Sequence, residues 1–369
     1  MTGGASTDQV RIAFALAGLH RVDRGAEVAF ISIASELARA SHEVTLIGSG
    51  PKRPGQPYRY LHAPAISRKR FGSFPKLPTL RSESAWEEAT FVPGLLAKYR
   101  PSDFDISVTC AFPFTQWALR RPVLGGKRPR HVFVTQNGDW PAVSDKAEFR
   151  FFSCDGLVCT NPDYFERNRE NYRCVLIPNG VDLNAFSPGA SERARFGLPE
   201  KGRIVLMASA LIESKKVAEG TKAVARVPGT VLVVAGDGPL RGDLAKLAAE
   251  LLPGRYIQLT VPAAEMPMLY RSADVFLHLS TDESFGNVFV EAMATGLPIV
   301  AIDTPRTRWI IGDDGFFPKG PSDNDLAGAI SRAFQSARGA SAANRKRAQK
   351  FGWPAIAARY ADFFGELCR

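Results

Sequence analysis

A segment near residue 290 combines two carboxylates with the start of a predicted helix. It reads Glu283-Ser-Phe-Gly-Asn-Val-Phe-Val-Glu291 and follows the apolar run VFLHLS, a predicted strand. Gly286 and Asn287 form the turn, so the N–H groups of residues 286–289 should be free and should bind an anion together with the helix dipole. Within one helix the two glutamates would lie about 12 Å apart, too far to share a proton. They could instead accept hydrogen bonds from hydroxyl groups on either side of a phosphate. The alternative is that they merely complement the helix dipole.

Positive charge and glycine turns follow two other predicted strands of the same half. Lys215 and Lys216 come after the apolar run RIVLMAS, where we expect them to contact phosphate, the alternative being a solvated surface. The turn Gly236-Asp-Gly238 follows TVLVVAG. Lysine is a flexible point charge, so either residue of the pair could make the contact.

Two Asp-x-Asp patterns invite a metal interpretation that their context does not favour. Asp103 and Asp105 directly precede a predicted strand, and Asp323 and Asp325 precede an Ala-rich helix, where Asp is a common cap. We therefore expect no metal site. His278, inside VFLHLS, is interpreted as a packed core histidine.

The elements that must position these residues form two successive α/β series. Short continuous apolar runs alternate with helical patterns, which predicts buried parallel strands joined by right-handed crossovers. The turn-rich stretch 179–188 should connect the two domains near residue 185, and doubly wound sheets bind ligands beyond the carboxyl ends of their strands. The predicted strands are 10–18, 42–48, 106–109, 131–135, 156–159, 175–177, 203–209, 230–236, 256–261, 275–280 and 298–302; the predicted helices are 26–40, 217–227, 240–252, 266–272, 287–295 and a final aromatic helix at about 344–367.

Composition restricts the class of protein. The 369 residues carry a net charge of +10, which favours anionic partners, and the five cysteines are too few and too scattered for a disulfide framework. The start of the chain lacks the pattern of a signal peptide and no run is long enough to span a membrane, so we expect a cytoplasmic protein. A nucleic-acid binder lacks a supporting motif, and a dehydrogenase lacks G-x-G-x-x-G after the first strand.

The segment ISRKRFGSFPKLPTLR, residues 66–81, holds five bases and no acid, with Phe71, Phe74 and Leu77 interleaved. A solvated loop is one interpretation. The other is contact with an anionic membrane surface or a charged acceptor, because each base near such a surface contributes roughly 1 kcal/mol.

Together these motifs resemble the family-4 retaining glycosyltransferases of the GT-B type. The resemblance rests on four segments in the family's order, which span nearly the whole chain: the E-x(7)-E signature at 283–291, Ile177-Pro-Asn-Gly-Val-Asp182, Ala235-Gly-Asp-Gly-Pro239, and a Gly-Gly-x-Glu-like turn present here as Arg24-Gly25-Ala26-Glu27. It implies an α/β fold with two Rossmann-like doubly wound parallel-sheet domains facing a central cleft. Residues 1–185, joined by a C-terminal helix at 350–369, would bind the acceptor, and residues 186–349 would bind a nucleotide sugar.

The resemblance assigns roles to the motif residues. Glu291 would hold the ribose hydroxyls, Glu283 a hydroxyl of the transferred sugar, and the backbone of Phe285–Val288 the sugar and diphosphate. Ala210 stands where the family has an Arg, whereas Lys215 matches the family's Lys and Lys216 could partly replace the lost charge. The expected catalytic residues are Glu283, Lys215 and Asp139, and the expected donor-binding residues are Gly25, Lys216, Gly236, Gly238, Phe285, Gly286, Asn287, Val288 and Glu291.

The turn Gln136-Asn137-Gly138-Asp139-Trp140 follows a first-domain strand where the family often has a His. Asn137 would replace this His as an acceptor-binding residue, next to Trp140. Asn cannot take a proton near neutral pH, so Asp139 is the expected proton acceptor. Simple turn chemistry explains the same residues equally well.

The implied activity is transfer of a hexosyl group, with retention, from a nucleotide diphosphate sugar to a hydroxyl acceptor. UDP is the commonest nucleoside diphosphate in the family, with GDP second, and the acceptor would be a saccharide or a lipid-linked glycan of the cell envelope. No metal or other cofactor is expected, nucleic acid is not an expected partner, and the protein would work in the cytoplasm, with possible contact at the inner face of the membrane. A nucleotide-sugar epimerase of the same fold and a non-catalytic sugar-nucleotide-binding module are the alternatives.

Overall fold

The computed structural model describes residues 9–123 and 126–369, and for residues 337–340 only the backbone. The first eight residues, which include most of the start judged not to be a signal peptide, lie outside this description. The chain divides into two units: unit 1 ends at Asn179 and also takes up Trp353–Arg369, and unit 2 is Gly180–Gly352. The sequence placed the first boundary near residue 185 and the final segment at 350–369.

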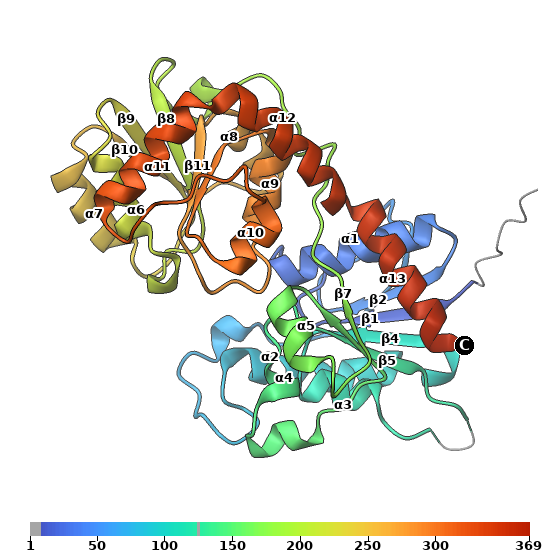
Figure 1. Ribbon diagram of the computed structural model, residues 1–369. Coiled ribbons are helices and arrows are strands. Elements are labelled where there is room, and N and C mark those ends of the chain that lie inside the picture. The colour runs from blue at the N-terminus through green and yellow to red at the C-terminus, as the bar shows by residue number, and fades with distance from the viewer. Residues whose placement is uncertain (1–8, 124–125) are drawn as a thin grey trace, which may run out of the picture. The chain divides into compact units, whose positions relative to one another are not determined.

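Unit 1 contains a seven-stranded, wholly parallel sheet in the order β3-β2-β1-β4-β5-β6-β7 (Figure 1). The order reverses direction between β1 and β4, which is the switch point of a doubly wound fold. The strands are β1 (Arg11–Ala15), β2 (Glu43–Gly48), β3 (Arg59–His62), β4 (Ile106–Thr109), β5 (Arg130–Val134), β6 (Gly156–Cys159) and β7 (Cys174–Leu176).

Helices cover both faces of this sheet, because alternate strand residues point to opposite sides. Ile12 and Phe14 of β1 pack with α1 and α13, which lie against each other, whereas Ala13 and Ala15 pack with α2 and α3. The helices of unit 1 are α1 (Gly25–Arg39), α2 (Glu83–Lys98), α3 (Phe114–Leu119), α4 (Trp140–Val143), α5 (Pro162–Asn168) and α13 (Trp353–Cys368), with short 3-10 turns at Arg68–Arg70, Pro101–Asp103 and Ala147–Phe151.

Unit 2 contains a five-stranded parallel sheet in the order β10-β9-β8-β11-β12 (Figure 1). Its switch point therefore lies between β8 and β11. The strands are β8 (Arg203–Ala208), β9 (Thr230–Ala235), β10 (Tyr256–Leu259), β11 (Val275–His278) and β12 (Ile299–Ala301).

The unit 2 sheet also has a buried core on each face. Ile204 and Leu206 of β8 pack with α8, α9 and α10, and Val205 and Met207 pack with α6, α7 and α11. The helices are α6 (Val217–Ala225), α7 (Arg241–Leu251), α8 (Met266–Arg271), α9 (Asn287–Thr295), α10 (Pro305–Ile311), α11 (Asp323–Gln335) and α12 (Ala337–Ala348), with 3-10 turns at Arg193–Phe196, Glu213–Lys215, Ala263–Glu265 and Gln349–Phe351.

The prediction of one final helix at about 344–367 is wrong. The helix α12 ends at Ala348, Gly352 is extended, and α13 begins at Trp353. Pro354 lacks an N–H group and is tolerated only in the first turn of a helix, so the chain must restart there. The backbone of Gly352 pairs instead with Val181 in a β-bridge. The break therefore coincides with the passage of the chain from unit 2 back to unit 1.

Among the described helices, none combines the length and the apolar content that a membrane span requires.

Candidate functional site

The strongest candidate site lies at the switch point of the unit 2 sheet, beyond the carboxyl ends of β8 and β11. Lys215 lies in the connection after β8 and Glu283 in the connection after β11, and Lys215 Nζ is 2.6 Å from Glu283 Oε1. Two side chains expected to be catalytic, 68 positions apart, thus meet in an ion pair. The hydroxyls of Ser209 and Ser280, also at these strand ends, are buried and have no hydrogen-bond partner in the described part of the chain.

Glu283 is held by donors from three other parts of unit 2. Its Oε1 accepts hydrogen bonds from Lys215 Nζ and, at 3.0 Å, from His278 Nε2, while Arg306 donates to its backbone carbonyl. Burial alone would raise the pKa of Glu283, but the hydrogen bonds and charges of His278 and Lys215 outweigh it and lower the pKa to about 2. The carboxylate is therefore ionised at neutral pH and available as an acceptor.

The interpretation of His278 as a packed core residue is incomplete. The ring is 2% exposed, nearly parallel to the ring of Phe276 and edge-on to that of Phe289, as a core residue would be. Its Nε2, however, contacts the Glu283 carboxylate. Sequence reasoning missed this contact because a single histidine in an apolar strand carries no signal of where its nitrogen points.

The helix α9 begins at Asn287, as predicted, and Gly286 forms its N-cap with a left-handed backbone (φ 92°). A side chain at Gly286 would also meet the ring of Phe289 at 2.8 Å. The expectation of free amides over residues 286–289 is wrong for Phe289, whose N–H donates to the carbonyl of Gly286. The amides of Gly286 and Val288 donate no hydrogen bond within the described part of the chain. Phe285 contributes only backbone here, because its side chain is buried against Trp309 and Phe351.

Glu291 lies inside α9, and its carboxylate accepts a hydrogen bond from one buried side chain. Its Oε2 accepts a hydrogen bond of 2.9 Å from the hydroxyl of Tyr270, a fully buried residue of α8. Burial raises the pKa of Glu291 to about 7, although the hydrogen bond from Tyr270 lowers it in part. Unlike Glu283, this carboxyl group changes its charge near neutral pH.

Gly236 and Gly238 allow two loops at the same edge to approach closely. A Cβ atom at Gly236 would lie 1.9 Å from the carbonyl oxygen of Ser209, and one at Gly238 would lie 2.6 Å from that of Leu211. Both contacts are to backbone of the connection that leads from β8 to Lys215, so these glycines position that connection. Lys216, the second lysine, forms the N-cap of α6 with a left-handed backbone (φ 52°).

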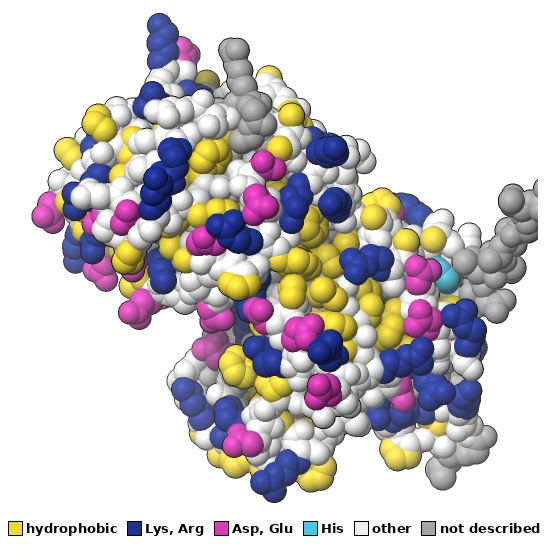
Figure 2. All heavy atoms as spheres, in the orientation of Figure 1, with side chains coloured by type: hydrophobic (Ala, Val, Ile, Leu, Met, Phe, Trp, Pro, Cys, Tyr) yellow, Lys and Arg dark blue, Asp and Glu magenta, His cyan; other side chains and the backbone are white. Residues whose placement is uncertain are grey.

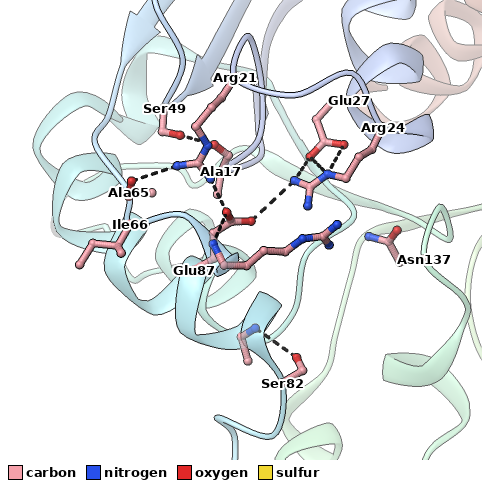
Figure 3. A network of polar contacts seen from close by, with 12 residues as sticks. Ala17, Arg21, Arg24, Glu27, Ser49, Ala65, Ile66, Ser82, Glu87 and Asn137 are labelled. Carbon is pink, nitrogen blue, oxygen red and sulfur yellow. Dashed lines mark hydrogen bonds and ion pairs between the residues drawn. The ribbon is translucent and has the colours of Figure 1, made fainter. Parts of the chain in front are cut away.

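In unit 1, the turn predicted at residues 24–27 contains an ion-pair network (Figure 3). Gly25 opens α1, and Arg24 just before it pairs with Glu27 and, at 3.6 Å, with Glu87 of α2. Arg21 also pairs with Glu87. The sequence did not indicate this network, in which Arg21 and Arg24 come from the β1–α1 connection, Glu27 from the first turn of α1, and Glu87 from α2.

After β5, two side chains expected to bind the acceptor are exposed, whereas the carboxylate expected to accept a proton is buried in an ion pair. Asn137 and Trp140 are exposed, with Trp140 at 64%. None of the contacts marked in Figure 3 reaches Asn137, whose side-chain amide donates to Cys110 Sγ at 3.9 Å. Asp139 is 4% exposed, and both its oxygens accept hydrogen bonds of 3.0 Å from Arg167, with Asn168 as a further donor. We therefore leave Asp139 out of the proposed catalytic groups.

The Asp-x-Asp residues have structural partners. Asp105 pairs with Arg11, and Asp325 completes the capping box of α11 with Ser322. Within the described ranges, no three His, Cys, Asp or Glu side chains are grouped as a metal site would require.

Comparison with known proteins identifies the family of the chain. The family model described as "Glycosyltransferase Family 4" matches residues 24–185, and the one described as "Glycosyl transferases group 1" matches residues 190–351. The chain therefore belongs to the family-4 glycosyltransferases. The two matched regions adjoin near residues 185–190, close to the boundary between unit 1 and unit 2.

Curated relatives match part of the chain. The D-inositol 3-phosphate glycosyltransferase of Mycolicibacterium smegmatis is 32% identical over 199 residues, which is 50% of this chain and 46% of that protein. The phosphatidyl-myo-inositol mannosyltransferase of Mycobacterium tuberculosis (strain ATCC 25618 / H37Rv) is 37% identical over 148 residues, 38% of this chain and 37% of that protein. The matched regions thus span less than half of these relatives.

Solved structures match nearly the whole fold. Sucrose-phosphate synthase from Thermosynechococcus elongatus superposes with a TM-score of 0.76 at 21% identity and covers 97% of this chain and 99% of that one. A glycosyltransferase from Rickettsia africae gives a TM-score of 0.72 at 16% identity, covering 98% and 99%. These likenesses, with the two parallel sheets, establish the GT-B fold.

Proposed function

We propose that this protein transfers a hexosyl group from a nucleotide diphosphate sugar to a hydroxyl group of an acceptor. UDP-sugars are the first donors to test. One observation carries the proposal: the carboxyl-terminal edge of the unit 2 sheet brings Lys215 and Glu283 together beside the start of α9. A Cβ atom at Gly286 would lie 3.8 Å from Cγ of Glu283, so the helix start and the ion pair are neighbours.

The donor roles follow from what each group can accept or donate. Glu291 accepts the ribose hydroxyls through the oxygen that Tyr270 leaves available, and Glu283 accepts a hydroxyl of the transferred sugar. The amides at the start of α9 and the ammonium of Lys215 face the diphosphate, with Lys216 nearby. In this arrangement Gly236 and Gly238 act through the backbone of the β8 connection, as their contacts with Ser209 and Leu211 support.

The chemical step places negative charge where these donors lie. The bond between the anomeric carbon and the diphosphate oxygen breaks, and charge develops on the diphosphate, where Lys215 and the α9 amides stabilise it. The acceptor hydroxyl attacks from the face that the diphosphate leaves and gives its proton to a diphosphate oxygen, so the anomeric configuration is retained. This step uses an ammonium and helix amides as the positive groups, and we propose that it requires no metal.

We assign the acceptor to unit 1, near Gly25, Asn137 and Trp140. The relatives that act on D-inositol 3-phosphate and phosphatidyl-myo-inositol support a polar or lipid-linked acceptor with several hydroxyl groups. A saccharide or lipid-linked glycan of the cell envelope has this chemistry.

Segment 66–81 supports peripheral contact with an anionic membrane. Phe74 and Leu77 are 46% and 45% exposed among the basic residues of this segment. In the region where Figure 1 draws α2 and α4, Figure 2 shows dark blue Lys and Arg side chains beside yellow hydrophobic ones. Bases and exposed apolar side chains on one surface match the headgroups and the acyl boundary of an anionic bilayer.

The test is a transfer assay with purified protein, UDP-glucose, UDP-galactose and GDP-mannose as donors, and inositol phosphates, phosphatidylinositol and glucosyl lipids as acceptors, with and without magnesium. We expect release of nucleoside diphosphate that depends on the acceptor, and an α-linked product from an α-linked donor. Conversion of the donor to an epimer without acceptor, or donor binding without any transfer, would contradict the proposal.

A further inference from the structure

The carboxylate of Glu283 receives two donors on one oxygen. Lys215 Nζ lies 2.6 Å and His278 Nε2 lies 3.0 Å from the same Oε1. The other oxygen, Oε2, accepts no hydrogen bond from the described residues. An ionised carboxylate accepts only, so the hydrogen in the second contact is carried by His278 Nε2.

The two donors differ in how firmly they are held. Lys215 reaches Glu283 by a flexible four-carbon chain from a short 3-10 turn. His278 is the last residue of β11, is 2% exposed, and its ring lies 6.2 Å from Phe276 and 5.0 Å from Phe289, measured between ring centroids. The aromatic rings fix the imidazole plane, and the strand fixes its backbone.

This difference matters once a donor substrate binds. The proposed function directs the ammonium of Lys215 to the diphosphate, and a cation that turns to a phosphate group weakens its contact with Glu283. His278 cannot follow, because it is enclosed by the core on the α9 side of the sheet. It would then be the remaining side chain that holds Oε1 and so leaves Oε2 directed at the sugar.

We propose that His278 is a positioning residue that holds the sugar-binding carboxylate of Glu283 in place while Lys215 serves the diphosphate. The proposal rests on the proposed function, and it assigns His278 no contact with substrate. Its effect should appear in the recognition and transfer of the sugar and not in the binding of the nucleoside diphosphate alone.

Two substitutions separate the hydrogen bond from the packing. In His278→Phe a ring of similar shape remains between Phe276 and Phe289, but the donor nitrogen is lost. In His278→Gln the side-chain amide places an N–H at about the reach of Nε2, so the donor is kept without the ring. Melting temperatures of both variants report whether unit 2 still folds.

The experiment measures dissociation constants for UDP and UDP-glucose, with GDP and GDP-mannose as the second pair, and the transfer kinetics with whichever sugar nucleotide the wild type uses. A hydrogen bond to a charged group commonly contributes a factor of roughly ten to a hundred. We expect His278→Phe to lower kcat/KM by about that factor. The affinity of this variant for the nucleoside diphosphate should stay within about twofold of the wild type. In His278→Gln most of the lost kcat/KM should be recovered.

A double-mutant cycle makes the assignment specific. If His278 acts through Glu283, the effects of His278→Phe and Glu283→Gln on kcat/KM should be strongly non-additive. Additive effects, a His278→Phe variant with wild-type transfer, or equal losses for UDP and UDP-glucose binding in a folded variant would overturn the proposal. A wild-type protein that neither binds nor uses any sugar nucleotide would instead refute the proposed function, and the inference with it.

Discussion

The two glutamates at the ends of the E-x(7)-E segment should change the stability of the protein in opposite directions when each is replaced by glutamine. The pKa of Glu291 is raised to about 7 by burial, whereas that of Glu283 is lowered to about 2 by His278 and Lys215 despite burial. The ordinary value for both is 4.5. Folding therefore opposes ionisation at Glu291 and favours it at Glu283.

The sign and size follow from proton linkage. At Glu291 the folded protein retains a proton that the unfolded chain releases, so stability falls as the pH rises from about 4.5 to 7 and is then constant. At Glu283 the ionised form is favoured in the folded state, so its contribution is present above pH 4.5 and is lost as the pH falls toward 2. Each shift corresponds to about 3 kcal/mol at ~1.36 kcal/mol per pH unit.

The substitutions test this directly. Glutamine at position 291 can still accept the hydroxyl of Tyr270 but carries no charge, so Glu291→Gln should stabilise the protein at pH 8 by up to about 3 kcal/mol, roughly 6–12 °C in the unfolding transition of unit 2. At pH 4.5 it should have little effect. Glu283→Gln leaves Lys215 without its charged partner and should destabilise unit 2 by a similar amount at pH 7.

Differential scanning calorimetry between pH 4.5 and 8 measures both effects on the full chain. Glu291→Gln should also weaken nucleotide-sugar binding while it raises the melting temperature. A Glu291→Gln variant that shows the same pH dependence as the wild type, or two variants that shift the melting temperature in the same direction at pH 8, would refute the electrostatic reasoning.

Three further predictions concern the charge, the glycine turn and the surface segment. Lys215→Met should lower the transfer rate by about a hundredfold because it removes positive charge from the leaving group, whereas the matched Lys216→Met should have a clearly smaller effect; equal losses would contradict the assignment. Gly236→Ala places a Cβ 1.9 Å from a backbone oxygen and should lower the free energy of unfolding by about 2 kcal/mol or more. The control Gly242→Ala in α7, where nothing lies within 4 Å, should be neutral or stabilising. Urea titration measures both effects. Replacing Lys69, Arg70 and Lys76 together by Glu should weaken binding to phosphatidylglycerol-containing vesicles by more than about tenfold, at roughly 1 kcal/mol per base, and the same change at Lys201, Lys246 and Lys319 should have a much smaller effect; equal effects in sedimentation assays would show that 66–81 is not the contact.

Much of the fold was predictable because parallel strands buried on both faces appear as continuous apolar runs. The helix α9 was predicted with both of its ends, since Gly286 and Gly296 delimit the apolar segment between them. The strand β3 was missed because it is a short edge strand, RYLH, in which only Tyr60 is buried. The break before α13 was missed because the apolar pattern continues past Gly352, although Gly352 and Pro354 are the residues that mark the end of one helix and the start of the next.

The site was predictable only where its residues are close together in sequence. The spacing of the two glutamates and the glycine turn within 283–291 predicted a binding site in that segment. Lys215 could be assigned to the same edge of the sheet because it follows a predicted strand. The contacts of Asp139 with Arg167, 28 residues away, and of Arg21 with Glu87, 66 residues away, depend on how the strands are ordered in the sheet. Composition and spacing do not specify such pairs. The contact between His278 and Glu283 spans only five residues, yet it depends on how the chain turns after β11.

Isothermal titration of nucleotide sugars into the wild type and into Glu291→Ala is the most direct measurement of the central claim, that the edge of unit 2 around α9 binds the donor. The account predicts that the wild type binds at least one of the sugar nucleotides and that removing this carboxylate weakens the binding by about tenfold or more. Unchanged affinity of Glu291→Ala for every nucleotide sugar that the wild type binds would contradict it.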